Sequence, residues 1–232
     1  MFNKVQSVFE SEKAFDYIRN QSLDLRYEFY CRYIFEKYLK VEKEKIESIL
    51  EIGCGDGKWL NFSMKYFNAK SGVGVDLSDK LISYAKNNYG SNNLVFLQEN
   101  ILEVEIKQKF DLIYNFAVVQ YFNINEFEKL IEKSKKMLNQ NGYIICMFIP
   151  NREKFWVAQA SRGVFAPVKQ IVKYPKHIVN YLTKRQGLWN WYDLKDMEKI
   201  AKKLSLKVWF EPYSFFDYRF DVIFQKGHLD EF

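Results

Sequence analysis

The stretch Ile49-Leu50-Glu51-Ile52-Gly53-Cys54-Gly55-Asp56-Gly57-Lys58 decides how this chain folds. An apolar run ends in an acid, and three glycines follow it at every second position. Glycine adopts backbone angles that are closed to other residues, and it lacks the Cβ that would block a ligand. The stretch therefore predicts a buried strand, a tight loop that faces a ligand, and then a helix.

This strand, loop and helix are the first members of an alternating series. Short apolar runs predict the strands Ser48–Ile52, Gly72–Val75, Asn93–Leu97, Leu112–Tyr114, Tyr143–Phe148, Lys207–Phe210 and Phe220–Gln225. Helical patterns predict the helices Lys58–Tyr66, Ser78–Asn88, Glu126–Leu138 and Leu194–Leu204. We expect Asp193 to cap the last helix and Asn141-Gly142 to end the third. Strands that alternate with helices favour an α/β fold, with a parallel sheet covered on both faces.

The length of 232 residues suits one domain, which we expect to span 1–232. Residues 1–47 are predicted to form an N-terminal helical extension, because Tyr27, Tyr30, Ile34 and Tyr38 share one stripe within 11–40. Residues 48–149 are predicted to form the cofactor-binding core. Residues 150–192 are too long for an ordinary loop and predict a helical, substrate-binding insertion after the fifth strand. Residues 193–232 supply the C-terminal helix and strands.

Composition excludes several classes of protein. Apolar residues make up 48% and charged residues 28%, which is an ordinary globular balance. The three cysteines, Cys31, Cys54 and Cys146, lack metal-ligand spacing, so we expect no metal site and no disulfide framework. The N-terminus lacks the apolar region of a signal peptide, and no run reaches the ~20 residues of a membrane span. The sequence therefore predicts a cytoplasmic protein without a membrane span.

Positive charge is concentrated in one segment. The net charge of the chain is +6, yet residues 151–192 alone hold eight basic residues and one acid, Glu153, which gives +7. The eight are Arg152, Lys154, Arg162, Lys169, Lys173, Lys176, Lys184 and Arg185. Such a local excess indicates an anionic partner for one face of the molecule.

A second acid helps to define the ligand. Asp76 ends the second strand, and a carboxylate at that place can accept hydrogen bonds from both ribose hydroxyls. A dinucleotide fingerprint would need its third glycine one position later, where this chain has Lys58. Glu51 would also repel a pyrophosphate, whereas it suits the positively charged amino group of a methionine moiety.

With these residues the sequence resembles the class I S-adenosylmethionine-dependent methyltransferases of the small-molecule type, whose first motif is E/D-x-G-x-G-x-G. The resemblance runs from about Ser48 to Phe148. It implies S-adenosylmethionine as cofactor and a Rossmann-like, seven-stranded, mostly parallel sheet with an antiparallel seventh strand. It implies that the cofactor contacts are Glu51, Gly53, Cys54, Gly55 and Gly57 at the methionine part, Asp76 at the ribose, Leu77, Asn100 and Ile101 at the adenine, and Asn115 and Phe116 at the sulfonium. Asn100 stands where the family usually has an acid.

The catalytic base is not evident. Many small-molecule members carry a His a few residues after the fourth motif, where this chain has Gln120-Tyr121. A base is needed only where the acceptor must lose a proton, so a hydroxyl needs one and an ionised phosphate or carboxylate does not. The best candidate is His177 in the insertion, and Tyr121 is the second.

The insertion is expected to set the substrate, because its aromatic residues interleave with its basic ones. The predicted substrate residues are Gln120, Arg152, Lys154, Trp189 and Trp191. We therefore expect a small anionic acceptor, such as a sugar, a sugar phosphate or another phosphate-type oxygen, for example in surface polysaccharide biosynthesis.

Two other classes of function stay open. An RNA methyltransferase would use the basic segment as its RNA surface. However, Asn115-Phe116-Ala117-Val118 lacks the Pro-Pro-aromatic arrangement of base-amine enzymes, so no stable nucleic acid partner is expected. The other class is a membrane-surface protein that binds S-adenosylmethionine or lipid without catalysis, or an enzyme directed to a lipid or quinone. A homodimer is compatible with either reading.

Overall fold

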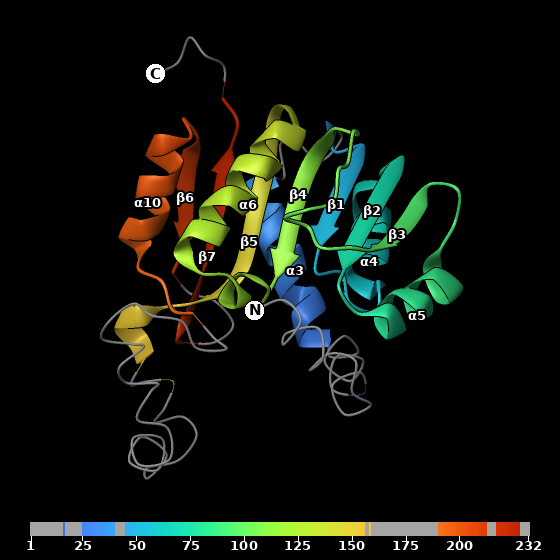
Figure 1. The fold of residues 1–232 in the computed structure, drawn as a ribbon, viewed down its shortest axis with the longest axis horizontal. Coiled ribbons are helices and arrows are strands. Elements are labelled where there is room, and N and C mark those ends of the chain that lie inside the picture. The colour runs from blue at the N-terminus through green and yellow to red at the C-terminus, as the bar shows by residue number, and fades with distance from the viewer. Residues whose placement is uncertain are drawn as a thin grey trace.

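A seven-stranded sheet runs through the part of the molecule that the structure describes (Figure 1). The structure is a computed structural model, and it describes residue 16 and residues 25–39, 45–155, 158, 190–212 and 217–227. The strands are β1 (Ser48–Ile52), β2 (Ser71–Asp76), β3 (Leu94–Gln98), β4 (Phe110–Phe116), β5 (Leu138–Pro150), β6 (Lys207–Glu211) and β7 (Arg219–Gln225). Their order is β3-β2-β1-β4-β5-β7-β6. Strands β1 to β5 pair in parallel, and β7 is antiparallel to both β5 and β6.

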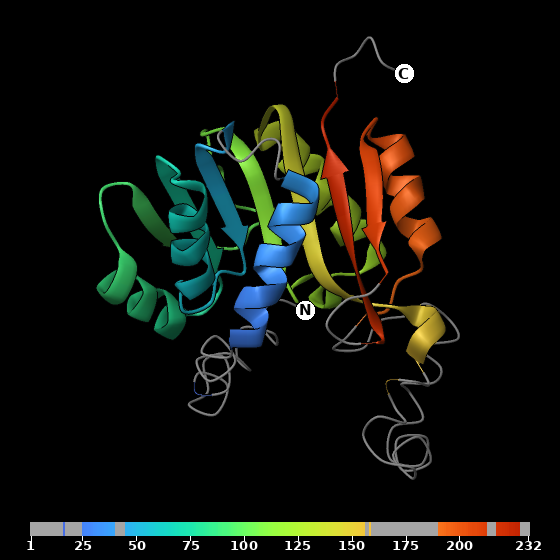
Figure 2. The ribbon, with the colours of Figure 1, turned by 180° about the vertical axis from the view of Figure 1, so that it is seen from behind.

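Helices cover both faces of this sheet. They are α3 (Leu25–Leu39), α4 (Lys58–Phe67), α5 (Asp79–Tyr89), α6 (Ile124–Met137) and α10 (Leu194–Lys203), with short 3-10 turns η2 (Val119–Tyr121) and η3 (Arg152–Lys154). Figure 1 shows α6 and α10 on the near face, and Figure 2 shows α3 crossing the opposite face. Each face has its own apolar core, one built with α6 and α10 and the other with α3, α4 and α5. The predicted α/β fold with a mostly parallel, seven-stranded sheet is confirmed.

One predicted turn is wrong. Asn141-Gly142 was expected to end the third helix, but α6 ends at Met137 and β5 begins at the next residue, Leu138. Asn141 has φ 63° and lies inside β5, where the pairing with β4 shifts its register. An Asn-Gly pair suits any place that needs a left-handed residue, and here that place is an irregularity in a strand.

Two sequence predictions fall mostly outside the described residues. Within 11–40 the structure describes a helix at Leu25–Leu39, in which Tyr30 and Ile34 are buried and Tyr38 is half-buried, as the stripe predicts. Of the insertion 150–192, only residues 150–155, 158 and 190–192 are described. The helical character and the substrate role of this insertion therefore stay predictions.

Two buried acids dock α3 on the sheet. Asp221 of β7 and Glu211 of β6 are cross-strand partners, and both are almost fully buried. The Tyr30 hydroxyl donates to Asp221, whereas Lys37 and the Tyr33 and Tyr38 hydroxyls donate to Glu211. Burial raises the pKa of Asp221 from 3.8 to about 7, although hydrogen bonds from Tyr30 and the backbone oppose that rise.

The raised pKa of Asp221 predicts a pH-dependent stability. Because the folded state binds this proton more tightly than the unfolded state, its stabilising effect is complete below the unfolded pKa and is lost as pH rises through about 7. The neutral variant Asp221→Asn lacks this dependence. The free energy of unfolding of the wild type should fall by about 3 kcal/mol relative to this variant between pH 5 and pH 8.

Chemical denaturation of both proteins across that pH range measures the difference. A difference that stays constant with pH would show that the Asp221 pKa is not raised.

Candidate functional site

The glycine loop follows β1 at the edge where the parallel strands end. Gly53, Gly55 and Gly57 have φ of 71°, 52° and 80°. The backbone N–H groups of Gly53 and Cys54 both donate to the carbonyl of Val75, at 2.7 and 3.1 Å. The loop is therefore closed against the end of β2, where Asp76 lies.

Packing as well as conformation requires two of these glycines. A Cβ on Gly53 would lie 2.3 Å from a methyl carbon of Val118, and one on Gly57 would lie 2.8 Å from Ala85 and from the ring of Phe96. Contacts this short force neighbouring atoms to move. Gly57 thus lets α5 and β3 approach the loop, and Gly53 lets the segment after β4 approach it.

Asp76 joins the loop to the second strand. Its Oδ2 accepts from the Gly55 N–H at 2.9 Å, and its Oδ1 accepts from the Ser78 N–H at 2.9 Å. A carboxylate oxygen can accept more than one hydrogen bond, so this arrangement is compatible with ribose hydroxyls as further donors. Two motifs that lie far apart in the sequence are therefore in direct contact.

Glu51 is a buried acid that is only partly satisfied. Its side chain in β1 is 1% exposed and is hydrogen-bonded by the Tyr114 hydroxyl, which itself accepts from Ser63 Oγ at 3.0 Å. Glu51 Oε2 has no hydrogen-bond partner among the described residues. Burial raises the pKa of Glu51 well above its usual value, and the neighbouring carboxylates Asp56 and Asp76 raise it further. A cation at Oε2 would relieve this cost, and the ammonium of a methionine moiety is such a cation.

The predicted sulfonium side lies on the neighbouring strand. Asn115 of β4 pairs with Ile52, directly before the loop, and it is 1% exposed. Its amide nitrogen contacts Cys146 Sγ at 3.0 Å, and its buried Oδ1 accepts no hydrogen bond within the described part of the chain. Phe116 lies between Trp59, at a ring distance of 6.0 Å, and Phe148, at 4.4 Å. An unsatisfied carbonyl oxygen and aromatic faces are both suited to a neighbouring positive sulfur.

The predicted adenine contacts lie on the next two loops. Asn100 Oδ1 accepts from the Leu102 N–H at 3.0 Å, and its amide donates to Glu103 at 2.8 Å. The Asn100 side chain therefore stabilises the turn at residues 100–103. Ile101 is buried and Leu77 is half-buried. Their contacts with an adenine stay a prediction.

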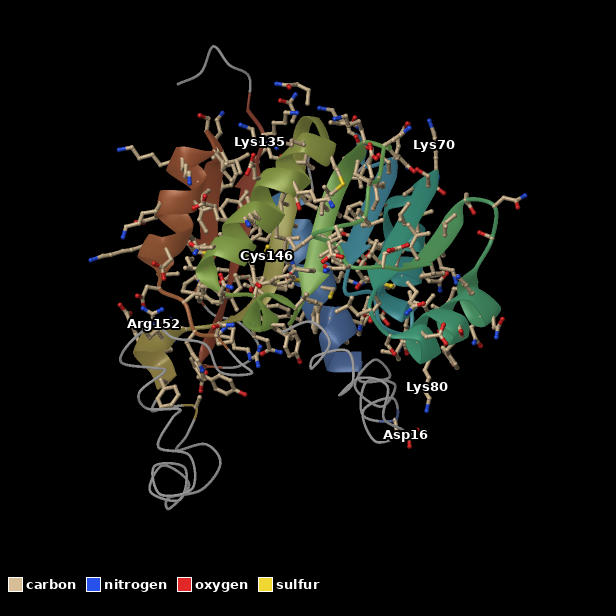
Figure 3. The ribbon with its side chains drawn as sticks, in the orientation of Figure 1. Asp16, Lys70, Lys80, Lys135, Cys146 and Arg152 are labelled. Atoms are coloured by element: carbon tan, nitrogen blue, oxygen red, sulfur yellow. The ribbon has the colours of Figure 1, made fainter. Side chains whose placement is uncertain are left out.

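The structure gives internal partners to two of the predicted substrate residues. Gln120 is 4% exposed; its amide donates to the Ala117 carbonyl at 2.9 Å, and its Oε1 accepts from Arg219 at 3.1 Å. Arg152 binds Asp193 at 2.8 Å and the Trp191 carbonyl at 2.7 Å, so its guanidinium anchors the start of α10. Figure 3 shows Arg152 at the foot of α10.

The remaining predicted residues are less constrained. Tyr121 is half-buried in η2 directly after β4, and Lys154 is half-buried in η3. Trp191 packs against Phe155 at a ring distance of 5.0 Å. His177 and Trp189 lie outside the described residues. Their catalytic and substrate roles stay predictions.

Sequence reasoning missed the partners of these residues. It did not find Tyr114, because nothing in an apolar strand shows that a tyrosine will reach an acid on the next strand. It also missed Arg219 and Asp221, although two charged residues within the apolar run of β7 were a usable signal.

Known proteins that resemble this chain are methyltransferases. Residues 49–142 match the family described as a methyltransferase domain. The chain is 24% identical to malonyl-[acyl-carrier protein] O-methyltransferase of Priestia megaterium, over 72% of this chain and 56% of that protein. It is 23% identical to juvenile hormone acid O-methyltransferase of Bombyx mori, over 84% and 67%. It is 34% identical to ubiquinone biosynthesis O-methyltransferase of Pelagibacter ubique, over 53% and 52%. The chain thus spans about half to two thirds of the length of these relatives.

Solved structures share the fold. Magnesium protoporphyrin IX methyltransferase from Synechocystis, with bound S-adenosylhomocysteine, matches with a TM-score of 0.66 at 14% identity, over 96% of this chain and 97% of that one. Residues 49–142 thus match a methyltransferase domain, and the fold of the chain is that of a methyltransferase solved with S-adenosylhomocysteine. Both findings agree with the S-adenosylmethionine cofactor that the first motif predicts.

The residues of this methyltransferase domain fit that cofactor. The unsatisfied Glu51 Oε2 suits the ammonium, the loop at Gly55 has no side chain to fill the space beside it, and Asp76, which is predicted to bind the ribose, is fixed to this loop. In the described ranges no helix is long and apolar enough to cross a membrane, and no cluster of His, Cys, Asp or Glu could hold a metal ion.

Gly55→Val should weaken cofactor binding without unfolding the domain. A β-branched residue at φ 52° introduces strain of about 1–3 kcal/mol. The substitution should also displace the N–H of residue 55, which donates a hydrogen bond to Asp76. We expect roughly 10- to 100-fold weaker binding of S-adenosylhomocysteine by calorimetry. Circular dichroism should show an unchanged fold, and an unchanged affinity would contradict the assigned position of the loop.

Glu51→Gln should raise the stability of the unliganded protein and weaken its binding of S-adenosylhomocysteine. The amide keeps an acceptor for Tyr114 but removes a buried negative charge, so the unliganded protein should melt at a higher temperature at pH 7. Because the pKa of Glu51 is raised in the folded state, ionisation of Glu51 destabilises the fold only above its unfolded pKa. The gain in melting temperature of Glu51→Gln should therefore disappear at acidic pH.

Binding of S-adenosylhomocysteine to Glu51→Gln should nevertheless weaken by roughly 10- to 100-fold, as for a lost charged hydrogen bond of about 1.5–3 kcal/mol. Equal affinities of the variant and the wild type would exclude Glu51 as the ammonium ligand.

Proposed function

We propose that the protein moves the methyl group of S-adenosylmethionine to an anionic oxygen of a small acceptor, and that this oxygen belongs to a carboxylate. The observation that carries the first half is the buried and partly satisfied Glu51 beside a loop fixed to Asp76. This pair supplies anionic groups for opposite ends of a sulfonium nucleoside.

The bound cofactor supplies a methyl group that is already activated by its positive sulfur. The chain therefore contributes mainly alignment, which can be worth ~7–11 kcal/mol of a reaction barrier. Glu51 and Asp76 hold the two ends of the cofactor, and Asn115 and Phe116 border the transferred group. An ionised oxygen needs no proton removed, so an acceptor of this class needs no general base.

The relatives support an oxygen acceptor. The names of all three relatives describe O-methyltransferases, one of which acts on an acid and another on a malonyl group. The charge of +7 in residues 151–192 supports an anionic substrate. Arg152 contributes little to that charge, since Asp193 and Asp196 lie 2.8 and 3.8 Å from its guanidinium. The sugar phosphate predicted from the sequence, as for polysaccharide synthesis, remains a second anionic class.

A hydroxyl of a quinol or phenol is the alternative acceptor. The relative from Pelagibacter ubique favours it, because its name places it in ubiquinone biosynthesis. A hydroxyl must lose its proton during transfer, so this acceptor needs a base such as His177 or Tyr121.

Release of S-adenosylhomocysteine from a defined panel tests the proposal. The panel contains decanoate, benzoate, glucuronate, glucose 6-phosphate, catechol and bulk tRNA. We expect turnover with the carboxylates, roughly 10- to 100-fold slower turnover at limiting cofactor with Gly55→Val, and a rate for His177→Ala within about twofold of the wild type. With catechol, loss of a base would slow transfer by about 100-fold or more.

The other outcomes are equally informative. Release with catechol alone, together with a slow His177→Ala, would replace the carboxylate by a hydroxyl. Release with glucose 6-phosphate alone would restore the sugar phosphate class. Release with tRNA alone would favour the RNA reading, whereas binding of S-adenosylhomocysteine without release from any acceptor would favour a binding protein.

A further inference from the structure

Phe148 is the residue at which β5 departs from a regular strand. It has φ 63°, in the left-handed region that large side chains rarely adopt. The β5–β7 pairing passes from Cys146↔Val222 to Ile149↔Phe220, so three steps on β5 oppose two on β7. One extra residue is thus inserted, which is a β-bulge.

The bulge changes the face on which Phe148 lies. Alternation places Ile145 and Met147 in the core under α3 and α4, and Ile144 and Cys146 in the core under α6 and α10. Phe148 should then return to the α6 side. Instead it shares the α3 side with Met147, and Ile149 takes the α6 side. The bulge therefore redirects one aromatic ring, which is a known use of such irregularities near active sites.

The redirected ring of Phe148 lies against Phe116, which is predicted to border the sulfonium. Phe148 is 2% exposed, and its ring centre lies 4.4 Å from that of Phe116 in an edge-to-face arrangement. Ala117, the next residue after Phe116, also has a positive φ, 56°, and its N–H donates to the Met147 carbonyl at 3.0 Å. Two strained backbone positions on adjacent strands thus meet beside Phe116.

Two buried polar side chains of β7 hold the backbone of Phe148 from both sides. Asp221 Oδ1 accepts from the Phe148 N–H at 2.7 Å, and an Arg219 terminal nitrogen donates to the Phe148 carbonyl at 2.6 Å. Both side chains are buried, at 0% and 6% exposure. A strained conformation persists only where its surroundings over-determine it, and here every polar backbone group of the strained residue is held.

We propose that Asp221 and Arg219 are positioning residues for methyl transfer, acting through Phe148 to fix the Phe116 ring beside the sulfonium. This inference rests on the proposed function of the same site. The other oxygen of Asp221 accepts from the Tyr30 hydroxyl, so docking of α3 and the placement of Phe116 depend on one carboxylate. Through this carboxylate, α3 is connected to the Phe148 backbone.

The hydrogen bonds of Asp221 and Arg219 to the Phe148 backbone form a clamp. The first measurement tests this clamp in the unliganded protein. Asp221→Leu removes the acceptor of the Phe148 N–H, whereas Asp221→Asn keeps an oxygen for it. Amide hydrogen exchange at Phe148 should quicken by about tenfold or more in the leucine variant, as for a lost charged hydrogen bond. The asparagine variant should stay close to the wild type. Equal protection in all three proteins would overturn the clamp.

The second measurement tests the effect on the site. The resonance of the bound methyl group, observed with methyl-13C-labelled S-adenosylmethionine, depends on the positions of nearby aromatic rings. We expect a displaced resonance in Asp221→Leu and in Phe148→Leu, and the wild-type resonance in Asp221→Asn. Affinity for S-adenosylhomocysteine should stay within about threefold of the wild type, because no ligand contact is removed.

Val222→Ala is the matched control. Val222 is buried in the same strand but faces the α6 side, so its loss lowers stability without touching the clamp. A resonance displaced equally by this control, or unmoved in Asp221→Leu, would overturn the proposal. If Asp221→Leu does not fold, an unmoved resonance in Phe148→Leu would overturn the proposal. A wild type that binds no S-adenosylhomocysteine would refute the proposed function, whereas the exchange result would still decide the clamp.

Discussion

The hydrogen bond between the Gly55 N–H and Asp76 is the interaction on which the site depends. It ties the loop after β1 to the end of β2, and the Ser78 N–H holds the other oxygen of the same carboxylate. The carboxylate is thus fixed by backbone donors, which carry no side-chain freedom to lose when a ligand binds. The glycines follow from this constraint, since the loop must bend back within a few residues while β3 and α5 press against it.

A second constraint is the burial of Glu51 at this edge. Glu51 is close enough to Asp56 and Asp76 for each to raise its pKa, and Glu51 Oε2 lacks a hydrogen-bond partner in the described part of the chain. Removing a carboxylate from water is costly unless a donor or a cation meets it. The proposed role of Glu51 follows from this cost, because the ammonium of a sulfonium amino acid would lower it and a pyrophosphate would raise it.

The sequence predicted the fold well because the fold rests on periodic patterns. Six of the seven strands were placed to within two residues at each end, since buried strands read as apolar runs and glycines mark the first loop, whereas β5 begins at Leu138, five residues before the predicted Tyr143. It failed at Asn141-Gly142, because a left-handed residue such as Asn141 serves an irregularity within a strand as well as a helix end. Its reading of the site was less complete. Glu51 and Asp76 stand out by position, whereas Tyr114 at Glu51 and Asp193 at Arg152 are visible only once the strands and helices are assembled. Counting Arg152 as available charge was the natural reading of a basic segment, and the ion pair with Asp193 removes it.

Phe148 connects β7 with the Phe116 ring of the predicted cofactor site. Its strain is a local departure from what a strand prefers, and local departures that the rest of the fold holds in place gather where function requires a particular geometry. Asp221 carries a cost of the same kind, because its burial raises its pKa while it supports both α3 and the strained peptide. Replacing this carboxylate by an apolar residue would lower the desolvation cost but leave the Phe148 N–H without its acceptor. A buried polar acceptor at this place in β7 therefore offsets part of its own desolvation cost through the Phe148 N–H and the Tyr30 hydroxyl.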